Sequence, residues 1–192
     1  MKNNSRKNRT RKKSKKYIFT VENYQSGDGM LTSVWGPSLW HYLHTMSFNY
    51  PIEPNKQEKK HYRDFIIKLQ YVLPCKYCRQ NLSRNFKAMP LKMCDMESRS
   101  TFSRYIYNLH EYINEMLGKK SGLSYEEVQE RYEHFRARCG KKNKTIKKKG
   151  KHKGCTEPLH KVKSKGVVKI IPANKKCESL QISKKCTQIK DL

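Results

Sequence analysis

The chain has 192 residues, and 43 Lys and Arg side chains against 16 Asp and Glu give it a net charge of +27. No run approaches the ~20 apolar residues of a membrane-spanning helix, so we expect a soluble chain, attached to acidic surfaces by charge at most. Residues 1–16 carry +9 and residues 140–192 carry +14, which leaves only +4 for residues 17–139. This division predicts one folded domain at 17–139 between two basic extensions.

The extensions differ from the middle in composition. Residues 1–16 lack the apolar segment of a secretory signal and the amphipathic spacing of a mitochondrial presequence, so we expect a disordered basic arm and a cytoplasmic location. Residues 140–153 are a Lys-rich linker too polar to bury a core. Residues 154–192 form a basic, cysteine-containing tail, in which the segment 154–159 and the apolar run at 167–172 predict a short hairpin or a docked strand.

Within 17–139 the apolar residues recur three and four positions apart, which predicts helices and no strand. The first helix is expected to begin near Pro37, which suits a first turn, and to end just before Pro51. The second is expected from about Asn55 to the residue before Pro74. A third, short helix begins at Cys75 or the residue after it and runs to about residue 86.

Capping signals place two further helices. Ser100 or Thr101 is expected to cap a fourth helix, which ends with Gly118 in a C-cap position. Ser124 and Glu127 form a capping box that starts a short fifth helix. The predicted fold class is therefore all-α: a four-helix bundle with a short fifth helix, flanked by basic, largely disordered extensions.

A lone Cys-x-x-Cys, Cys75 to Cys78, stands at the start of the third predicted helix. Two cysteines on a first helical turn can close a small disulfide ring, and the helix amino terminus lowers the pKa of a thiol placed there. The same spacing is half of many zinc sites, so alone it leaves a redox role and a metal role equally open. Tyr77, between the cysteines, is either a surface aromatic at a thiol-docking site or a core residue.

Two other protein classes are alternatives to a redox enzyme. A zinc-binding module would need two more ligands, and the chain has no second closely spaced cysteine pair. A nucleic-acid-binding protein is suggested by the charge of +27, but the middle of the chain is nearly neutral and holds no nucleic-acid-binding motif. Non-specific contact of the basic tails with nucleic acid or anionic surfaces remains a secondary expectation.

Aromatic and polar side chains share two helix faces. Trp40 and His44 lie four residues apart on the first predicted helix, as do His110 and Asn114 on the fourth. Two facing helices can therefore present a stacking ring, two imidazoles and an amide to one cavity. Taken singly, Trp40 is equally explained by core packing, and either histidine by a satisfied or surface position.

The motifs, in their order and spacing, are Trp35-Gly36-x-x-x-Trp40-x-x-Leu43-His44, Tyr50-Pro51, Pro74-Cys75-x-x-Cys78 and His110-x-x-Ile113-Asn114-x-x-Leu117-Gly118-Lys119. Together they resemble the Erv/ALR family of FAD-linked sulfhydryl oxidases over residues 31–139. The segment 123–127 and the short, basic, cysteine-poor amino terminus are more similar to forms encoded by large cytoplasmic DNA viruses than to mitochondrial ones.

The resemblance implies a thiol oxidase. In the family a client or shuttle dithiol reduces the Cys-x-x-Cys disulfide, electrons pass to FAD, and oxygen accepts them to give hydrogen peroxide. Cys75 then meets the incoming thiol and Cys78 faces the flavin. Thiol-containing client proteins, a homodimer formed by the first and second helices, and disulfide formation in virion proteins in the host cytoplasm or the virion are implied too.

The resemblance also implies an FAD site without a dinucleotide-binding fingerprint, and the chain contains no G-x-G-x-x-G. No metal is implied. The implied cofactor-binding residues are Gly36, Trp40, His44, Tyr50, His110, Asn114, Lys119 and Tyr132.

Two substitutions depart from the family pattern. Pro37 stands where many cellular members have arginine, and Glu111 stands where a His-Asn pair would place asparagine. The polar contacts to the cofactor are therefore expected to differ in part. Cellular members also staple the last helix with a long-range disulfide; here Cys139 is present, but Tyr125 occupies the region of its partner.

The other cysteines leave alternatives open. Cys94 is a free buried thiol, a partner for Cys139 or a zinc ligand, and a free thiol fits a reducing compartment. A shuttle outside the bundle would have to use Cys155, Cys177 or Cys186 on the flexible tail. The alternatives are a local disulfide in the tail or three unpaired thiols.

Overall fold

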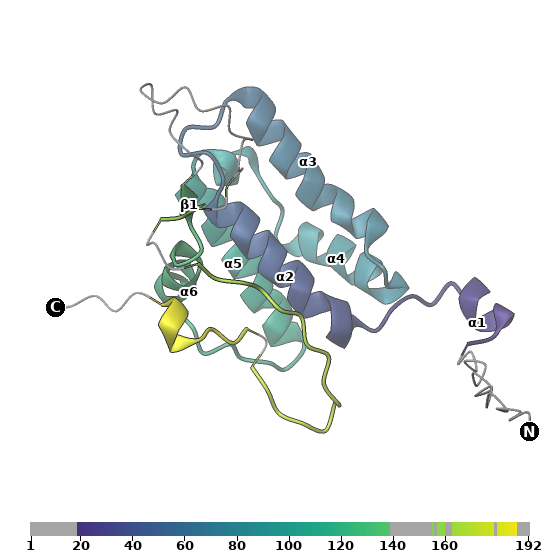
Figure 1. The fold of residues 1–192 in the computed structure, drawn as a ribbon. Helices are drawn as coiled ribbons and strands as arrows, with labels where there is room; N and C mark the ends of the chain where they lie inside the picture. The colour runs from purple at the N-terminus through teal and green to yellow at the C-terminus, as the bar shows by residue number, and fades with distance from the viewer. Residues whose placement is uncertain (1–18, 139–154, 156, 160–162, 179, 188–192) are drawn as a thin grey trace, which may run out of the picture.

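The computed structural model describes residues 19–138, 155, 157–159, 163–178 and 180–187 (Figure 1). The predicted arm at 1–16 and linker at 140–153 lie outside these residues. Four long helices and a shorter one make up the bundle, which confirms the all-α prediction. They are α2 Thr32–Phe48, α3 Lys56–Val72, α4 Lys76–Ala88, α5 Arg99–Met116 and α6 Tyr125–Glu133.

The helices pack in pairs around one main core. Helix α2 contacts α5 and α6, α3 contacts α4, and the 3-10 turn η1, Met93–Met96, contacts both α5 and α3 (Figure 1). The buried side chains of the main core are Leu43, Tyr50, Ile66, Leu69, Leu73, Leu82, Leu91, Met96, Phe102, Tyr105, Ile106 and Leu109. Because apolar burial stabilises by about 25 cal/mol per Å², this cluster is what holds the helix pairs together.

A second, smaller core lies under α6. It consists of Phe48, Tyr125, Val128 and Tyr132, and Leu180 of the carboxy-terminal segment packs against it. This contact docks part of the tail on the bundle.

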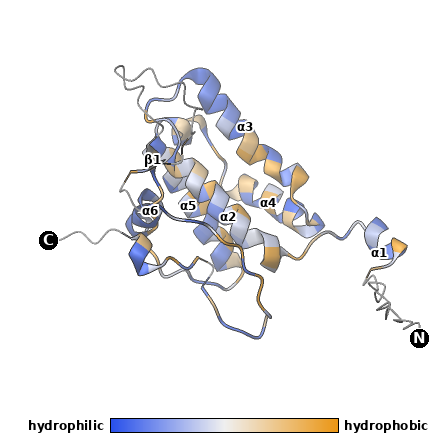
Figure 2. Cartoon of the chain, in the orientation of Figure 1, coloured by the Kyte–Doolittle hydropathy of each residue, from blue (hydrophilic) through white to orange (hydrophobic). Residues whose placement is uncertain are grey.

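Helix α3 shows how the hydropathy pattern matches the packing. Its first half is hydrophilic and its second half is hydrophobic, so that the apolar part lies toward the α4 end (Figure 2). Ile66 and Leu69 of that half are buried. Phe65 and Val72 of the same half remain exposed.

Three predicted helix boundaries are confirmed. Asn55 caps α3 and forms a capping box with Glu58, and Ser124 forms one with Glu127 at the start of α6. Gly118 follows α5 with a φ of 64°, the left-handed conformation that suits glycine after a helix end. Each of these boundaries depends on hydrogen bonds between residues close in sequence.

Two predicted helix starts are wrong. Helix α2 begins at Thr32 rather than at Pro37, which lies inside the helix. The helical turn before Pro37 is stabilised in two ways: the carbonyl of Leu31 accepts a hydrogen bond from the amide of Val34, and Trp35 packs against the main core. Tertiary packing thus extends the helix upstream of the proline.

Helix α5 is capped by Ser98 rather than by Ser100 or Thr101. The Ser98 hydroxyl accepts the amide of Thr101, and the Thr101 hydroxyl accepts the amide of Ser98. Thr101 therefore occupies the third helical position, where the usual capping box has Glu or Gln.

The structure contains short elements that the sequence pattern did not predict. Helix α1, Val21–Gln25, is capped by Thr20, and η2, Lys184–Cys186, is a single 3-10 turn. Strand β1, Ala137–Arg138, lies in the domain for which no strand was predicted, and it forms because its backbone pairs antiparallel with β2, Glu157–Pro158. The tail strand lies within the predicted segment 154–159, whereas the predicted run 167–172 forms no strand and its residues Val167 and Ile170 are exposed. Among the described residues no helix is long and apolar enough to cross a membrane.

A short strap, residues 29–32, leads from α1 into the start of α2 and lies against the backbone at the start of α4. The amide of Met30 donates to the carbonyl of Pro74 at 2.7 Å, and Gly29 forms an isolated antiparallel bridge with Cys75. Gly29 has a φ of 103°, and a Cβ at this position would lie 2.5 Å from the carbonyl oxygen of Pro74. The close approach of strap and α4 therefore requires glycine.

We predict that Gly29→Ala releases the strap without unfolding the bundle. Clash and backbone strain should weaken strap docking by about 1–3 kcal/mol. Hydrogen exchange of the Met30 amide measures the effect, and it should become faster. Gly27→Ala is the matched control, because a Cβ at Gly27 meets nothing within 4 Å. Equal Met30 protection in the two variants would contradict the assignment.

Candidate functional site

Cys75 and Cys78 form a disulfide at the amino terminus of α4, with their Cα atoms 5.1 Å apart. Helix α3 ends at Val72 because Pro74 disfavours the helical conformation before it. Cys75 is the N-cap of α4, and its Sγ accepts the amide of Cys78 at 3.2 Å. Two sulfur atoms thus lie at the positive end of a helix dipole.

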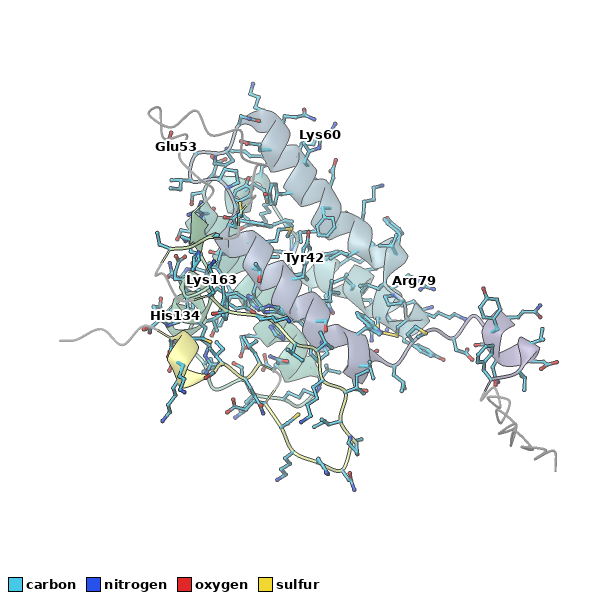
Figure 3. All side chains as sticks on the ribbon, viewed as in Figure 1. Tyr42, Glu53, Lys60, Arg79, His134 and Lys163 are labelled. Carbon is cyan, nitrogen blue, oxygen red and sulfur yellow. A yellow bond between two sulfur atoms is a disulfide. The ribbon has the colours of Figure 1, made fainter. Side chains whose placement is uncertain are left out.

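The surroundings of the disulfide join three elements. The guanidinium of Arg79 donates to the carbonyl of Leu73, which ties α4 to the end of α3 at the edge of the bundle (Figure 3). The Thr32 hydroxyl of α2 lies 3.2 Å from Cys78 Sγ. Cys78 also packs against the main core, whereas Tyr77 is 72% exposed and is therefore a surface aromatic.

A cluster of aromatic and imidazole rings lies between α2 and α5. His44 Nε2 and His110 Nδ1 are hydrogen-bonded at 2.9 Å. The Trp40 ring stacks on His110, with centroids 3.9 Å apart and planes 7° from parallel. The structure therefore brings together three of the four residues that the helical spacing placed on facing helices.

Burial keeps both imidazoles neutral. Burial, with smaller contributions from nearby His110 and His41, lowers the pKa of His44 to about 3. Burial is also the largest cause that lowers the pKa of His110 to about 4, a shift that Glu111 opposes and Lys119 favours. A neutral pair is required by the geometry as well, because one ring nitrogen must donate and the other must accept.

The neutral pair leaves one polar atom without a partner. His44 is 4% exposed, and its Nδ1 has no hydrogen-bond partner in the described part of the chain. An unsatisfied buried polar atom costs about 1–3 kcal/mol and calls for an explanation. A planar ligand with polar edges would satisfy this nitrogen and stack on the rings, so the residues present fit an aromatic cofactor.

The remaining predicted cofactor residues have different surroundings. Tyr132 is buried beside the pair, 5.4 Å from the His44 ring, and burial raises its pKa to about 12. Gly36 is buried in α2. Tyr50 is fully buried in the main core, where its hydroxyl donates to the carbonyl of Met96. Its polar atom is thus already satisfied in the core.

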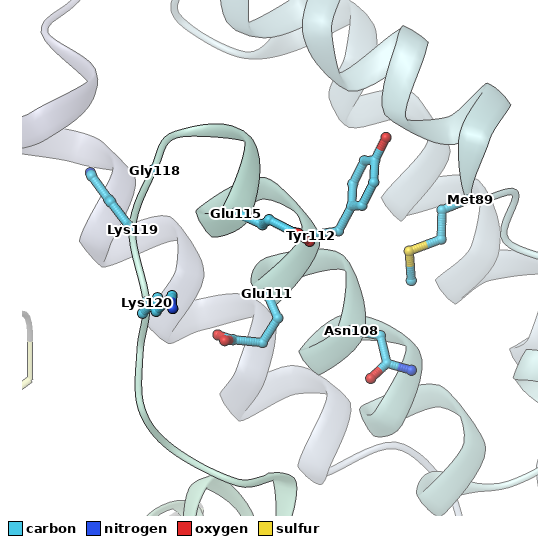
Figure 4. A pocket seen from close by; sticks show the side chains of 8 residues that line it. All are labelled: Met89, Asn108, Glu111, Tyr112, Glu115, Gly118, Lys119 and Lys120. Atoms are coloured by element: carbon cyan, nitrogen blue, oxygen red, sulfur yellow. The ribbon is translucent and has the colours of Figure 1, made fainter.

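A cavity of about 670 Å³ opens along α5 (Figure 4). Its lining combines carboxylates, lysines and apolar side chains: Met89, Asn108, Glu111, Tyr112, Glu115, Gly118, Lys119 and Lys120. The cavity lining includes none of Trp40, His44 and His110, and Glu111 is the residue that follows His110 in α5. The Asn114 amide donates to Glu111 at 3.0 Å, which orients this carboxylate.

Sequence reasoning named Glu111, Lys119 and Gly118 in this region but missed the other lining residues. Asn108 lies three residues before Glu111 and four before Tyr112, and Glu115 lies four after Glu111 and three after Tyr112, which places them on one face of α5. That spacing is the signal that could have found them.

The other cysteines separate into two groups. Cys94 is free, but it is exposed rather than buried. Cys177 and Cys186 are free, and Cys155 is disulfide-bonded. Cys139 lies outside the described residues. Within the described ranges, no group of three His, Cys, Asp or Glu side chains is placed to hold a metal ion.

Comparison with known proteins places this geometry in a family. The pattern of the Erv1 / Alr family matches residues 37–133. The chain is 33% identical over 99 residues to a probable FAD-linked sulfhydryl oxidase of Acanthamoeba polyphaga mimivirus, a match that covers 52% of this chain and 68% of that protein. It is 30% identical over 84 residues to an FAD-linked sulfhydryl oxidase of Oryza sativa subsp. japonica, covering 44% of this chain and 42% of that one.

Among solved structures, the yeast Erv1 core is similar at 22% identity with a TM-score of 0.47, covering 67% of this chain and 96% of that one. The sequence matches are sufficient to assign the family. The chain belongs to the Erv1 / Alr family.

We predict that the buried imidazole pair makes folding sensitive to acid. Both histidines have folded pKa values below 6.5, so the unfolded chain binds more protons as the pH falls. Their contribution is complete above pH 6.5 and is lost as the pH falls through about 4 for His110 and about 3 for His44. The slope per histidine reaches at most about 1.4 kcal/mol per pH unit.

Urea unfolding over this pH range tests the prediction. His44→Gln should flatten the dependence of the unfolding free energy on pH. His61→Gln is the control, because His61 is exposed on α3 and bonds only Gln57 among the contacts described. The account is contradicted if the two variants have the same slope as the unaltered chain.

Proposed function

We propose that this chain is an FAD-linked sulfhydryl oxidase that forms disulfide bonds in thiol-containing client proteins. The observation that carries the proposal is the Cys75–Cys78 disulfide at the N-cap of α4, packed on the same core as Trp40. Membership of the Erv1 / Alr family supports the reaction class. Relatives named as FAD-linked sulfhydryl oxidases support the cofactor.

The dithiol step needs only this chain and a client. A client thiolate attacks Cys75 Sγ, a new intermolecular disulfide forms, and the electron pair of the broken bond goes to Cys78 Sγ. A second client thiolate then attacks the client sulfur and releases Cys75. The client gains one disulfide, and two electrons and the balancing protons remain with the Cys75–Cys78 pair. The helix amino terminus favours negative charge on both sulfurs.

The cofactor would be held where α2 and α5 face each other. Trp40 would stack on it, the free Nδ1 of His44 would bond its polar edge, and Lys119 would attract its phosphates. His110 and Tyr132 would close the ring cluster, and Gly36, Tyr50 and Asn114 complete the proposed set. When bound, FAD accepts the electron pair of the dithiol and transfers it to oxygen, which leaves as hydrogen peroxide.

The chain is further proposed to form a homodimer and to act in a viral setting. Tyr42 of α2 and Phe65 of α3 are exposed and lie edge to face with centroids 6.1 Å apart, which supports a homodimer through these helices. The similarity to a mimivirus protein supports a viral setting, in the host cytoplasm or the virion, with virion proteins as clients.

The tail cysteines retain a proposed role in a shuttle. Cys177 is free and exposed and Cys186 is free and half-buried, so both thiols are present in the state that relays a disulfide. A pair of this kind would pass electrons from client proteins to Cys75 of a partner subunit.

The purified chain should be yellow and should consume oxygen with dithiothreitol as the thiol. Cys75→Ser and Cys78→Ser should each reduce this turnover to the level of free FAD while FAD stays bound, because both sulfurs take part in the exchange. Cys94→Ser is the control, since Cys94 is free and exposed and belongs to another element. Retained turnover in Cys78→Ser would refute the proposal.

A further inference from the structure

The strap brings a hydroxyl group to the redox disulfide. Thr32 is the first residue of α2, and its Oγ1 lies 3.2 Å from Cys78 Sγ. A disulfide sulfur carries no hydrogen, so the hydroxyl must be the donor in this contact. No other hydrogen bond of the Thr32 hydroxyl is present among the described residues.

The position of Thr32 is held from both sides. Met30, two residues earlier, donates its amide to Pro74 and accepts the indole N–H of Trp35 at 3.0 Å. Trp35 in turn packs against the main core. The hydroxyl is therefore placed against Cys78 by contacts that involve the backbone of the redox turn itself.

From this contact we infer that Thr32 stabilises negative charge on Cys78 Sγ when the disulfide opens, and so favours Cys78 as the leaving group. The inference deepens the proposed function and rests on its assignment of Cys75 as the attacked sulfur. A client thiolate bonds to Cys75 Sγ, the Cys75–Cys78 bond breaks, and its electron pair becomes the Cys78 thiolate. The Thr32 O–H then donates to a charged acceptor, and such hydrogen bonds are shorter and stronger than neutral ones.

Charge on the leaving sulfur decides the rate and direction of thiol exchange, since a better-stabilised thiolate leaves faster. Among the described residues, the backbone amide of Cys78 is the one donor to Cys75 Sγ, and this bond serves the helix cap. Cys78 Sγ has a side-chain donor from another helix. The two sulfurs are thus distinguished by residues outside the Cys-x-x-Cys motif.

The test isolates Cys78 in a Cys75→Ser background of the full chain. The rate of alkylation of Cys78 by iodoacetamide, followed by mass spectrometry, is measured against pH. Thr32→Val should move the midpoint of this curve upward by about one pH unit, a tenfold loss of thiolate below the midpoint. Thr32→Ser, which keeps the hydroxyl, should restore most of the difference.

Thr45→Val is the matched control. Thr45 is also an exposed α2 threonine, but its hydroxyl donates to the carbonyl of His41 within the helix. Its curve should coincide with that of the background variant. If Thr32→Val and Thr45→Val give the same midpoint, or if Thr32→Ser shifts as far as Thr32→Val, the role of the Thr32 hydroxyl is refuted.

A second measurement uses the intact Cys75–Cys78 pair. In glutathione buffers, Thr32→Val should leave a larger fraction of the pair oxidised, because the reduced state loses the stronger hydrogen bond; an unchanged fraction contradicts the inference. Neither readout needs FAD or turnover. A shift without oxidase activity in the unaltered chain would uphold the Thr32 contact and reject the oxidase, whereas activity without a shift would do the reverse.

Discussion

The hydrogen bond between His44 and His110 is the contact on which the candidate site depends. It joins α2 to α5 at 2.9 Å inside the ring cluster, and burial keeps both rings neutral. A neutral pair can satisfy only one nitrogen of each ring by this bond. The position of Trp40 over His110 and the free Nδ1 of His44 both follow from this arrangement. The buried interface between α2 and α5 thus contains one polar atom, His44 Nδ1, that has no hydrogen-bond partner among the described residues.

Helix α2 connects this cluster to the redox turn. Its first residue, Thr32, contacts Cys78, and twelve residues later His44 contacts α5. At 1.5 Å per residue these two points lie about 18 Å apart along one rigid element. The strap holds the first turn of α2 against the start of α4, and Gly29 allows the two backbones to approach closely. One helix therefore positions residues for both the disulfide and the proposed cofactor.

Much of the fold followed from local chemistry in the sequence. The Asn55 and Ser124 capping boxes and Gly118 give correct helix ends because their hydrogen bonds are local. The predicted starts of α2 and α5 are wrong because Trp35 packing extends α2 and because Ser98, paired with Thr101 in a capping box, caps α5. The i, i+4 pairs Trp40/His44 and His110/Asn114 correctly predicted that the two histidines face each other. No local pattern indicates the Thr32–Cys78 contact, because its partners lie 46 residues apart.

The central claim is that His44 and His110 form a binding site for FAD. A ligand that binds only the folded state raises its stability by RT ln(1 + [L]/Kd). The most direct test is the thermal unfolding temperature of flavin-free protein as FAD is added. The account predicts a rise that grows with FAD concentration and is absent in the double variant His44→Ala/His110→Ala. An equal rise in the double variant would contradict it.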